Sequence, residues 1–440
     1  MTRATLLLTI ACSTFVSRAG VAQDAAIRLT LDDAIAQGLD HSHRIAELQA
    51  RKEGADAAEA AQAAARLPSV ALQGGYTRTN HVDEFGIVQP GAPPRIIYPD
   101  IPDNYRARID LNWPLYSGGR TDALERAAAA EGHAADEDVA AARSDLRLEI
   151  ARGFWALVSA IETEQVLARS LENAAAHVTD LRSRFEQGLL PPNDVLSAET
   201  QASRQRVLSI ESHNMREIAE ADLRRLLGLD GGGRLEPVPT PDEPGAPAAP
   251  IDALLSEARK SRPELRATAE RTAASRAREA AVAATARPQV GVNGGYDYAR
   301  PNPRIFPRHG SWQDSWDVSV NASWLLWDGG RRRAEMAGAA AASRALDARA
   351  ADLDRQIAFE VRQRWLELES SRAAISAAAD GVVSATEARR VVMERFRAGV
   401  ITSSDVLDAD LAVLQAELDL TRSRAQAHLA QARLDRAVGK

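Results

Sequence analysis

Two stretches of the chain carry acidic side chains at matched positions. Residues 184–196 read RFEQGLLPPNDVL and residues 395–407 read RFRAGVITSSDVL, so both contain Arg-Phe, then one Gly, then Asp-Val-Leu. These stretches contain Asp194 and Asp405, and Asp408 follows in the second copy alone. An Asp at such a place can stabilise the N-terminus of a helix through its exposed N–H groups. Alternatively, carboxylates gathered around a narrow pore form a charged ring that selects cations.

No other set of residues indicates a reaction centre. His41 and His43 are two positions apart near a predicted helix start, so they do not share a helix face, as a pair of zinc ligands would need. The chain shows no nucleophile–base pair, no phosphate-binding loop and no confined pair of carboxylates. We therefore expect no enzyme activity, no metal and no cofactor. With 54 basic and 61 acidic residues, the chain also lacks the basic excess expected of a nucleic-acid-binding protein.

The first 22 residues resemble a secretory signal. Arg3 precedes a short apolar run, and small residues end the segment at Ala22, which would permit cleavage before Gln23. Cys12 is the only cysteine and lies in this segment, so the mature chain would carry no disulfide. A lipoprotein with an acylated Cys12 is the alternative. No later stretch reaches 18 consecutive apolar residues, so no transmembrane helix is predicted.

The duplication extends over most of the chain. LYSGGR at 115–120 matches LWDGGR at 326–331, and the two are 211 residues apart, like the paired acidic stretches. We expect a first repeat at 23–230 and a second at 251–440, separated by a Gly/Pro-rich linker at 231–250 with no helix or strand pattern. Two copies are too few for a solenoid, so we interpret the pattern as an internal duplication.

Each repeat contains two segments in which apolar and polar side chains alternate. These segments predict strands at about 68–78, 105–116, 288–298 and 316–327. Strands of this length and alternation are typical of a membrane β-barrel, which is apolar toward lipid and polar toward water. Aromatic residues at the strand ends would form its two interfacial girdles, with Tyr105 and Trp316 at one level and Trp113 and Trp324 at the other. A soluble sandwich with one wet face is the alternative.

Four strands are too few for a barrel in one chain. Single-chain barrels start at about eight strands, and lipid does not tolerate an open sheet edge. If the strands lie in a membrane, several chains must therefore pool them.

Most of the remaining sequence predicts helix. The run from Thr121 to Gln187 contains no proline and has apolar residues at helical spacing, so it would form a helix of roughly 100 Å. Shorter helices are predicted at 193–227 and 41–66. An Ala-rich seam with heptad-like spacing would let neighbouring helices pack closely, as in coiled coils.

The junctions PLYSGGR (114–120) and LLWDGGR (325–331), together with the paired acidic stretches, resemble the TolC-like outer-membrane efflux channels. The resemblance covers about residues 28–440, in the same order and with the same duplication. It implies a mainly helical fold with a small membrane β part, in which three chains form one twelve-stranded barrel in the outer membrane and a helical tunnel in the periplasm. It also implies two partners, a periplasmic adaptor protein and an inner-membrane transporter.

The same resemblance assigns roles to individual residues. Asp405 and Asp408 fall on the constricting aspartates of the family, and Asp194 is the first-copy equivalent of Asp405. The periplasmic tip and its adaptor contacts would involve Gly188, Leu189, Gly399 and Val400. The strand–helix junctions would be marked by Gly118, Gly119, Gly329 and Gly330.

These expectations favour one function and leave two rivals. The favoured function is a passive exit duct for small molecules in a tripartite efflux system, with energy supplied by the inner-membrane partner. The exit duct of a type I protein secretion system would have the same architecture. A soluble periplasmic coiled-coil scaffold is the rival of another class, and it would purify without detergent.

Overall fold

The structure is a computed structural model that describes residues 26–239, 245 and 249–440. The described residues are mainly helical and fall into two compact units, each assembled from separate parts of the chain. The hairpin unit comprises the described residues of Met1–His41, Ile150–Glu243 and Gly381–Ala425; the sheet unit comprises those of Ser42–Glu149, Pro244–Asp380 and Gln426–Lys440. The predicted signal segment at 1–22, with Cys12, lies outside the described residues.

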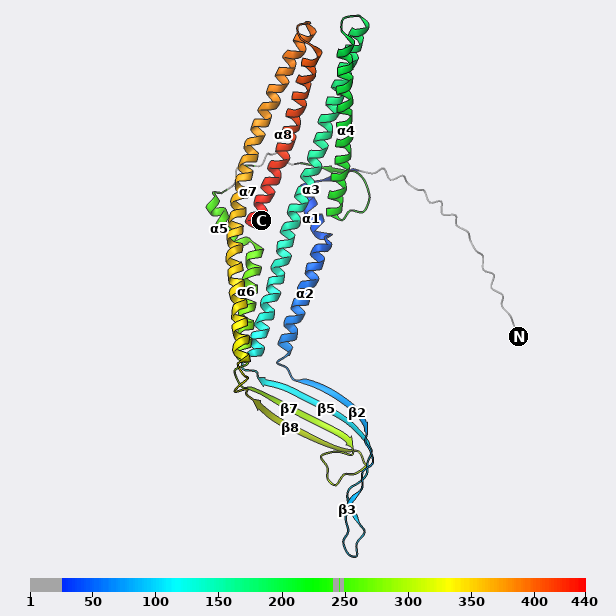
Figure 1. Ribbon diagram of the computed structural model, residues 1–440, viewed down its shortest axis with the longest axis vertical. Helices are drawn as coiled ribbons and strands as arrows, with labels where there is room; N and C mark the ends of the chain where they lie inside the picture. The colour runs from blue at the N-terminus through cyan, green and yellow to red at the C-terminus, as the bar shows by residue number, and fades with distance from the viewer. Residues whose placement is uncertain (1–25, 240–244, 246–248) are drawn as a thin grey trace, which may run out of the picture. The chain divides into compact units, whose positions relative to one another are not determined.

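Each repeat contributes two short helices and two long ones (Figure 1). In order, they are α1 (Leu31–Asp40), α2 (His43–Ala64), α3 (Arg120–Glu186), α4 (Pro192–Leu227), α5 (Ile251–Ser261), α6 (Pro263–Ala284), α7 (Arg331–Arg397) and α8 (Ser403–Val438). The two copies match closely, because α3 and α7 each contain 67 residues and α4 and α8 each contain 36. Among the described residues, no helix is both long enough and apolar enough to cross a membrane.

The start of the first repeat differs from the sequence prediction. One helix was expected at 41–66, but α1 precedes α2 because Thr30 and Ser42 each accept a hydrogen bond at the N-terminus of a separate helix. In the second repeat, Pro263 begins α6, where the missing N–H of proline costs nothing.

Two glycines end the long return helices at matched positions. Gly228 (φ +66°) follows α4, and Gly439 (φ +93°) follows α8. A Cβ on Gly228 would lie 2.8 Å from the Cβ of His41, and a Cβ on Gly439 would lie 2.9 Å from the backbone carbon of Ser261. Both the left-handed backbone and the close contact therefore require glycine.

A buried core joins the helices of the second repeat in the sheet unit. Its members are Leu254, Ala258, Ile357, Val361, Leu368, Ala430, Leu434, Ala437 and Val438. Beside it, Arg262 donates from Nη1 to the carbonyls of Arg436 and Ala437, at 3.3 and 3.2 Å. These carbonyls lie in the last turn of α8, where helix carbonyls lack intrahelical partners. Arg436 also pairs with Glu264; although burial opposes ionisation, this pairing helps to lower the pKa of the Glu264 carboxyl.

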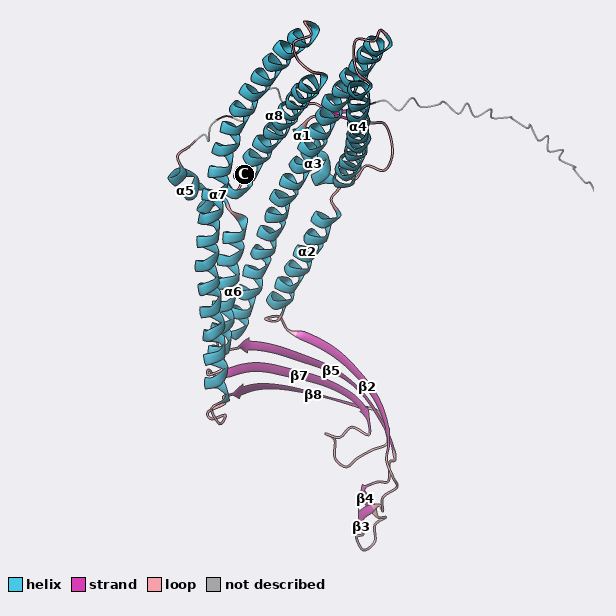
Figure 2. Ribbon diagram, turned by 45° about the horizontal axis from the view of Figure 1, so that its top comes forward, coloured by secondary structure: helices cyan, strands magenta, loops and turns pink. Residues whose placement is uncertain are grey.

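Four antiparallel strands form one sheet in the order β2-β5-β7-β8 (Figure 2). Their bounds are Ser69–Arg78 for β2, Asp103–Tyr116 for β5, Gln289–Arg300 for β7 and Gln313–Ser323 for β8. Val70 pairs with Leu111, and Val292 pairs with Val320, so apolar side chains share one face, as the alternation predicts. Within the described sheet, β2 and β8 are each paired on one side only.

The last strand begins at Gln313, so it both begins and ends earlier than the 316–327 predicted from the sequence. It ends at Ser323 instead of continuing to 327. The indole Nε1–H of Trp324 donates to the carbonyl of Ala286 at 3.0 Å, just beyond α6. Trp113 makes the equivalent bond in the first repeat, yet β5 continues to Tyr116, so this bond alone does not end the strand.

Two further pairs of short strands were not predicted. The segment between β2 and β5 contains the hairpin of β3 (Phe85–Ile87) and β4 (Arg95–Tyr98). The expectation of no strand at 231–250 is wrong, because β6 (Leu235–Pro237) pairs in parallel with β1 (Ile27–Leu29). Leu235 is buried, and its N–H donates to the carboxylate of Glu220 at 2.9 Å. Its strand partner lies at the other end of the repeat, so no local pattern marks it.

The hairpin unit buries a histidine between α3 and the start of α8. His177 is 8% exposed, and its Nε2 lies 3.3 Å from the Oγ of Ser403. Its ring meets the ring of Phe396 edge-on, with centroids 5.8 Å apart. The surrounding core consists of Val178, Leu181, Val195, Ala198, Phe396 and Val406.

The surroundings of His177 favour the neutral ring. Burial is the largest effect and lowers the pKa of His177. The carboxylates of Asp410 and Asp180 oppose this effect, whereas the guanidinium groups of Arg184 and Arg389 add to it. The packing of α8 against α3 therefore includes a group whose protonation is unfavourable in the folded state.

We expect this packing to weaken in mild acid. Because the folded-state pKa of His177 is lowered, its stabilising contribution is complete above the ordinary histidine pKa of about 6.5 and is lost as the pH falls through the folded-state value. One proton changes the free energy of unfolding by at most about 1.4 kcal/mol per pH unit. Amide protection factors in the first turns of α8 should therefore fall as the pH decreases below about 6.5. In His177→Gln this fall should disappear; an equal fall in that variant would contradict the assignment.

Candidate functional site

Both hairpin ends turn through the same backbone geometry. After α3, the N–H of Gly188 (φ +74°) donates to the carbonyl of Phe185 at 2.8 Å, and the N–H of Leu189 donates to Arg184 at 2.9 Å. After α7, the equivalent atoms around Gly399 (φ +71°) make the same two bonds, both at 3.0 Å. This pair of bonds is the Schellman C-cap, which places a left-handed residue after the helix. The repeated glycine is thus explained by backbone conformation.

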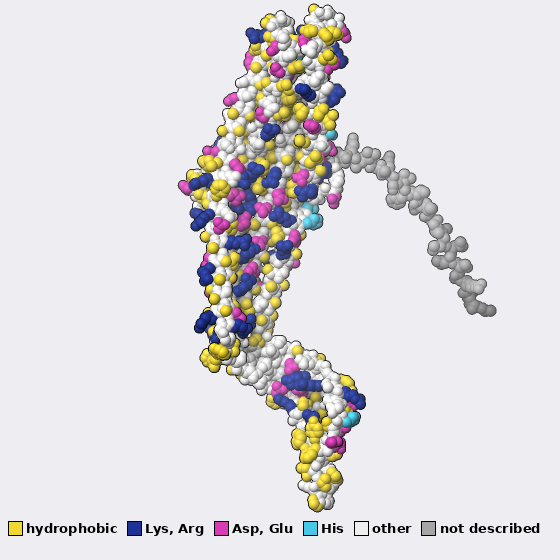
Figure 3. All heavy atoms as spheres, in the orientation of Figure 1, with side chains coloured by type: hydrophobic (Ala, Val, Ile, Leu, Met, Phe, Trp, Pro, Cys, Tyr) yellow, Lys and Arg dark blue, Asp and Glu magenta, His cyan; other side chains and the backbone are white. Residues whose placement is uncertain are grey.

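The residue after each of these glycines is apolar and exposed. Leu189 is 67% exposed and Val400 is 69% exposed. Both stand at the point where a long helix reverses into its partner, and hydrophobic side chains are visible near the hairpin ends (Figure 3). The two hairpins therefore present equivalent apolar tips.

The three predicted constriction residues have different surroundings. Asp405 accepts hydrogen bonds from the N–H and the hydroxyl of Thr402, at 2.9 and 2.7 Å, which lower the pKa of its carboxyl. This is the N3-to-N-cap half of a capping box. Asp194 has the same place in α4, but its N-cap is Pro191, which has no N–H to donate. Asp408 is exposed, and it forms no hydrogen bond or ion pair with the described residues.

The sequence analysis did not identify an ion pair and a buried amide that lie near the hairpin ends. Arg389 of α7 pairs with Asp410 of α8. They stand ten residues before and eleven residues after Gly399, so counting outward from the turn would have placed them opposite each other. Both line a pocket of about 200 Å³ together with Gln205 of α4. Gln205 is 2% exposed, and its Oε1 has no partner among the described residues.

The strand–helix junctions are built from paired left-handed glycines. A Cβ on Gly118 would lie 2.8 Å from the carbonyl oxygen of Ala284, so the junction packs tightly against the end of α6. The preceding residue caps the helix in both copies. Ser117 Oγ accepts from the N–H of Thr121 at 3.2 Å, and the carboxylate of Asp328 accepts from two N–H groups of the α7 start. The four predicted junction residues, Gly118, Gly119, Gly329 and Gly330, all have positive φ.

The predicted girdle tryptophans tie strands to helices. Trp113 and Trp324 occupy matched positions, and each donates its indole N–H to a backbone carbonyl just beyond α2 or α6, at 3.2 and 3.0 Å. At the other end of the sheet, the ring of Tyr105 lies 5.0 Å from that of Tyr76. Trp316 is 70% exposed. The structure thus places aromatic residues at both ends of the strands, while contact with lipid stays a prediction.

One face of the sheet exposes its apolar side chains. Each of the following is at least two-thirds exposed: Val70, Leu72, Trp316, Val318 and Val320. Hydrophobic side chains also cover the β3–β4 hairpin (Figure 3). An exposed apolar surface of this extent marks a site of association with a membrane or a protein.

The opposite face of the sheet is charged. Asp297, whose side chain is 4% exposed, pairs with Arg106 at 2.5 Å and with Arg108. Arg108 also contacts Asp110 at 2.6 Å and Asp317 at 3.3 Å. The network joins β5 of the first repeat to β7 and β8 of the second, so the pattern of one strand could not reveal it. Its residues share the polar face that the alternation predicts.

Comparisons with known proteins agree with this architecture. The family model described as "Outer membrane efflux protein" matches residues 34–229 and 254–440. The chain is 24% identical over 440 residues to outer membrane protein TolC of Vibrio cholerae, covering 97% of this chain and 94% of that protein. A membrane protein from Pseudomonas aeruginosa has a similar structure, with a TM-score of 0.79, 21% identity and 93% of both chains covered. The outer membrane protein VceC of Vibrio cholerae gives a TM-score of 0.76 at 19% identity, covering 93% of this chain and 96% of VceC.

The two matched segments contain all four strands of the sheet and all four long helices. They fall in the two halves of the predicted duplication. The predicted TolC-like fold and the outer-membrane location are therefore confirmed. The chain belongs to the outer membrane efflux protein family.

Proposed function

We propose that this protein is a passive exit duct for small molecules, and that it forms the outer-membrane part of a tripartite efflux system. The observation that carries this proposal is the sheet, which exposes one apolar face and has two unpaired edges. Such a sheet suits a barrel wall that lies between lipid and water. The duct would need no cofactor, because an inner-membrane transporter would supply the energy.

Three chains would complete the barrel. The N–H and C=O groups along β2 and β8 need partners in lipid, and the β strands of neighbouring copies can supply them. Four strands from each of three chains make twelve, which lies within the range of membrane barrels. The polar face, with Arg106, Arg108 and Asp297, would then line the aqueous lumen.

The hairpin ends would form the periplasmic constriction and the contact with an adaptor protein. Asp408 is exposed and without a partner in the described chain, so its charge is available to the lumen. Asp194 is also free of a cap bond, whereas Asp405 is engaged with Thr402. The exposed Leu189 and Val400 suit an apolar contact with the adaptor.

Drug or dye efflux by cells tests the proposed cargo. Deleting the gene should raise the accumulation of a small lipophilic dye, and the wild-type gene should restore its export. A variant that cannot form the barrel should not restore it. Normal dye export together with the loss of one secreted protein would instead identify a duct for protein secretion.

The barrel wall can be tested with a matched pair of substitutions. Val320→Arg places a charge on the apolar face and should cost about 2–4 kcal/mol of membrane stability if this residue faces the mid-bilayer. Ser319→Arg, on the adjacent polar face, should cost far less. The wild-type protein should purify in detergent as a trimer of roughly 140 kDa from chains of 47.4 kDa. Equal trimer yields from the two variants after urea treatment would argue against a lipid-facing Val320.

The constriction can be tested by single-channel recording in a planar bilayer. Asp408→Asn should lower cation selectivity and weaken block by multivalent cations without loss of trimer, because Asp408 makes no bond that Asn would lose. Asp405→Asn should lower selectivity less, since its charge is partly satisfied by Thr402. Unchanged selectivity in the triple variant with Asp194→Asn would remove all three residues from the constriction.

A further inference from the structure

The segment between β7 and β8 folds back across the polar face of the sheet. We call residues 301–310 the strap. Asn302 is 1% exposed and donates from Nδ2 to the carbonyl of Gln313 at 3.0 Å and to the Oγ of Ser315 at 3.1 Å. Arg304 donates from Nη1 to the carbonyl of Trp316 at 2.6 Å. These bonds fasten the strap to β8.

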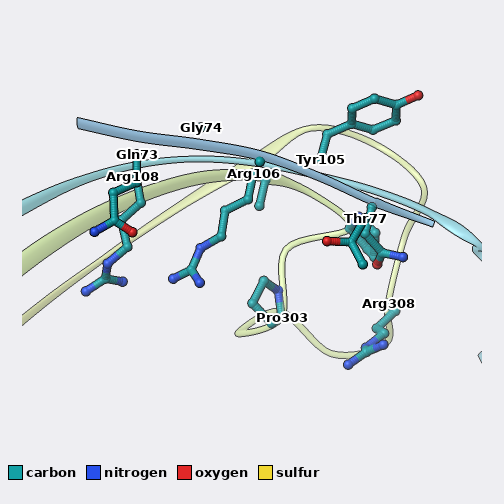
Figure 4. A pocket seen from close by; sticks show the side chains of 12 residues that line it. Gln73, Gly74, Thr77, Tyr105, Arg106, Arg108, Pro303 and Arg308 are labelled. Carbon is teal, nitrogen blue, oxygen red and sulfur yellow. The ribbon is translucent and has the colours of Figure 1, made fainter. Parts of the chain in front are cut away.

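A pocket of about 300 Å³ lies between the strap and the sheet. Figure 4 shows Arg106 and Arg108 reaching from β5 toward the strap, while Tyr105 points to the other side of the sheet. The remaining hydrogen-bonding side chains of the lining are Gln73, Thr77, Asn104 and Arg308. The lining contains three arginines and no acidic residue, so its chemistry favours an anion.

Two of the three arginines have free hydrogen-bonding capacity. Arg108 is held by three carboxylates and serves the structure of the sheet. Arg106 uses its Nε on the buried Asp297, and its two terminal nitrogens have no partner in the described chain. Its side chain is 52% exposed, so these nitrogens are accessible.

Arg308 approaches the same pocket from the strap. Its Nη1 donates to the hydroxyl of Tyr98 at 3.2 Å, and its guanidinium lies 5.1 Å from the centre of that ring. Its contacts with the described residues are to Tyr98, and none is to a carboxylate. A guanidinium fixed against an aromatic ring keeps several donors for a planar or tetrahedral anion. The strap itself, PNPRIFPRHG, contains two arginines and no acidic residue.

We propose that this pocket is an anion-binding site, in which Arg106 and Arg308 bind a carboxylate or phosphate group of a departing solute. The proposal rests on the proposed function, since the polar face borders the lumen only in an assembled duct. Charge-assisted bonds from guanidinium groups recognise such anions strongly, and Gln73 and Thr77 add neutral partners. A trimer would carry three such sites. The duct would thereby concentrate anionic cargo at the strap, in contrast to the acidic hairpin ends.

The experiment uses citrate as the probe and full-length protein in a bilayer of zwitterionic phosphatidylcholine, so that anionic lipid cannot compete. Citrate added on the strap side should block the wild-type channel more strongly than citrate added on the opposite side. Arg308→Gln and Arg106→Gln should each weaken this block about tenfold, the usual effect of losing a charged hydrogen bond. Arg95→Gln is the matched control, because Arg95 of β4 does not line the pocket.

Several outcomes would overturn the site. A conducting wild-type channel without citrate block, or equal block in Arg308→Gln, removes the anion site and leaves the duct in place. If the wild type does not conduct, the duct proposal fails, and calorimetric titration of the detergent-solubilised protein with citrate decides the anion site separately. The site is supported if the wild type shows a heat of citrate binding that Arg106→Gln and Arg308→Gln lose and Arg95→Gln keeps. The absence of heat in the wild type rejects it.

Discussion

An antiparallel sheet with one apolar face and two unpaired edges imposes a condition that no single copy of this chain meets. Valine, leucine and tryptophan side chains on that face are exposed, whereas the opposite face carries a network of arginine and aspartate. The first surface requires an apolar neighbour and the second requires water. The unpaired N–H and C=O groups of β2 and β8 require further strands wherever water is absent. Assembly in a membrane meets all of these requirements together.

The two repeats use the same kinds of residue to connect strands to helices and to turn the helical hairpins. Each strand pair connects to helices through two left-handed glycines and a polar capping residue. Each strand end is fastened to a short helix by an indole N–H, from Trp113 in one half and from Trp324 in the other. Each hairpin end is a Schellman turn around Gly188 or Gly399. These positions are constrained by backbone conformation, so the two copies remain alike there.

The copies differ at the starts of α4 and α8 and in the segments that join the paired strands. Thr402 lets Asp405 complete a capping interaction, but Pro191 denies the same interaction to Asp194. Only the second copy adds Asp408. The first strand pair is joined through the β3–β4 hairpin, and the second through the arginine-bearing strap. The differences at Thr402, Asp405 and Asp408 cost the fold little, because these side chains are exposed. They are therefore positions at which the charge can differ between the two copies.

Periodicity and repetition in the sequence were sufficient for the four strands, the long helices, the hairpin turns and the family. Alternation of side chains with period two, proline-free runs and Gly at the turns are local signals, and each appeared twice. Strand β6, the Asp297 network, the buried His177 and the strap pocket were decided only by tertiary structure. Each depends on contacts between segments far apart in the chain, such as β5 with β7 or α3 with α8. A sequence pattern records which face a residue occupies, but only the packed structure determines which distant side chain lies opposite it.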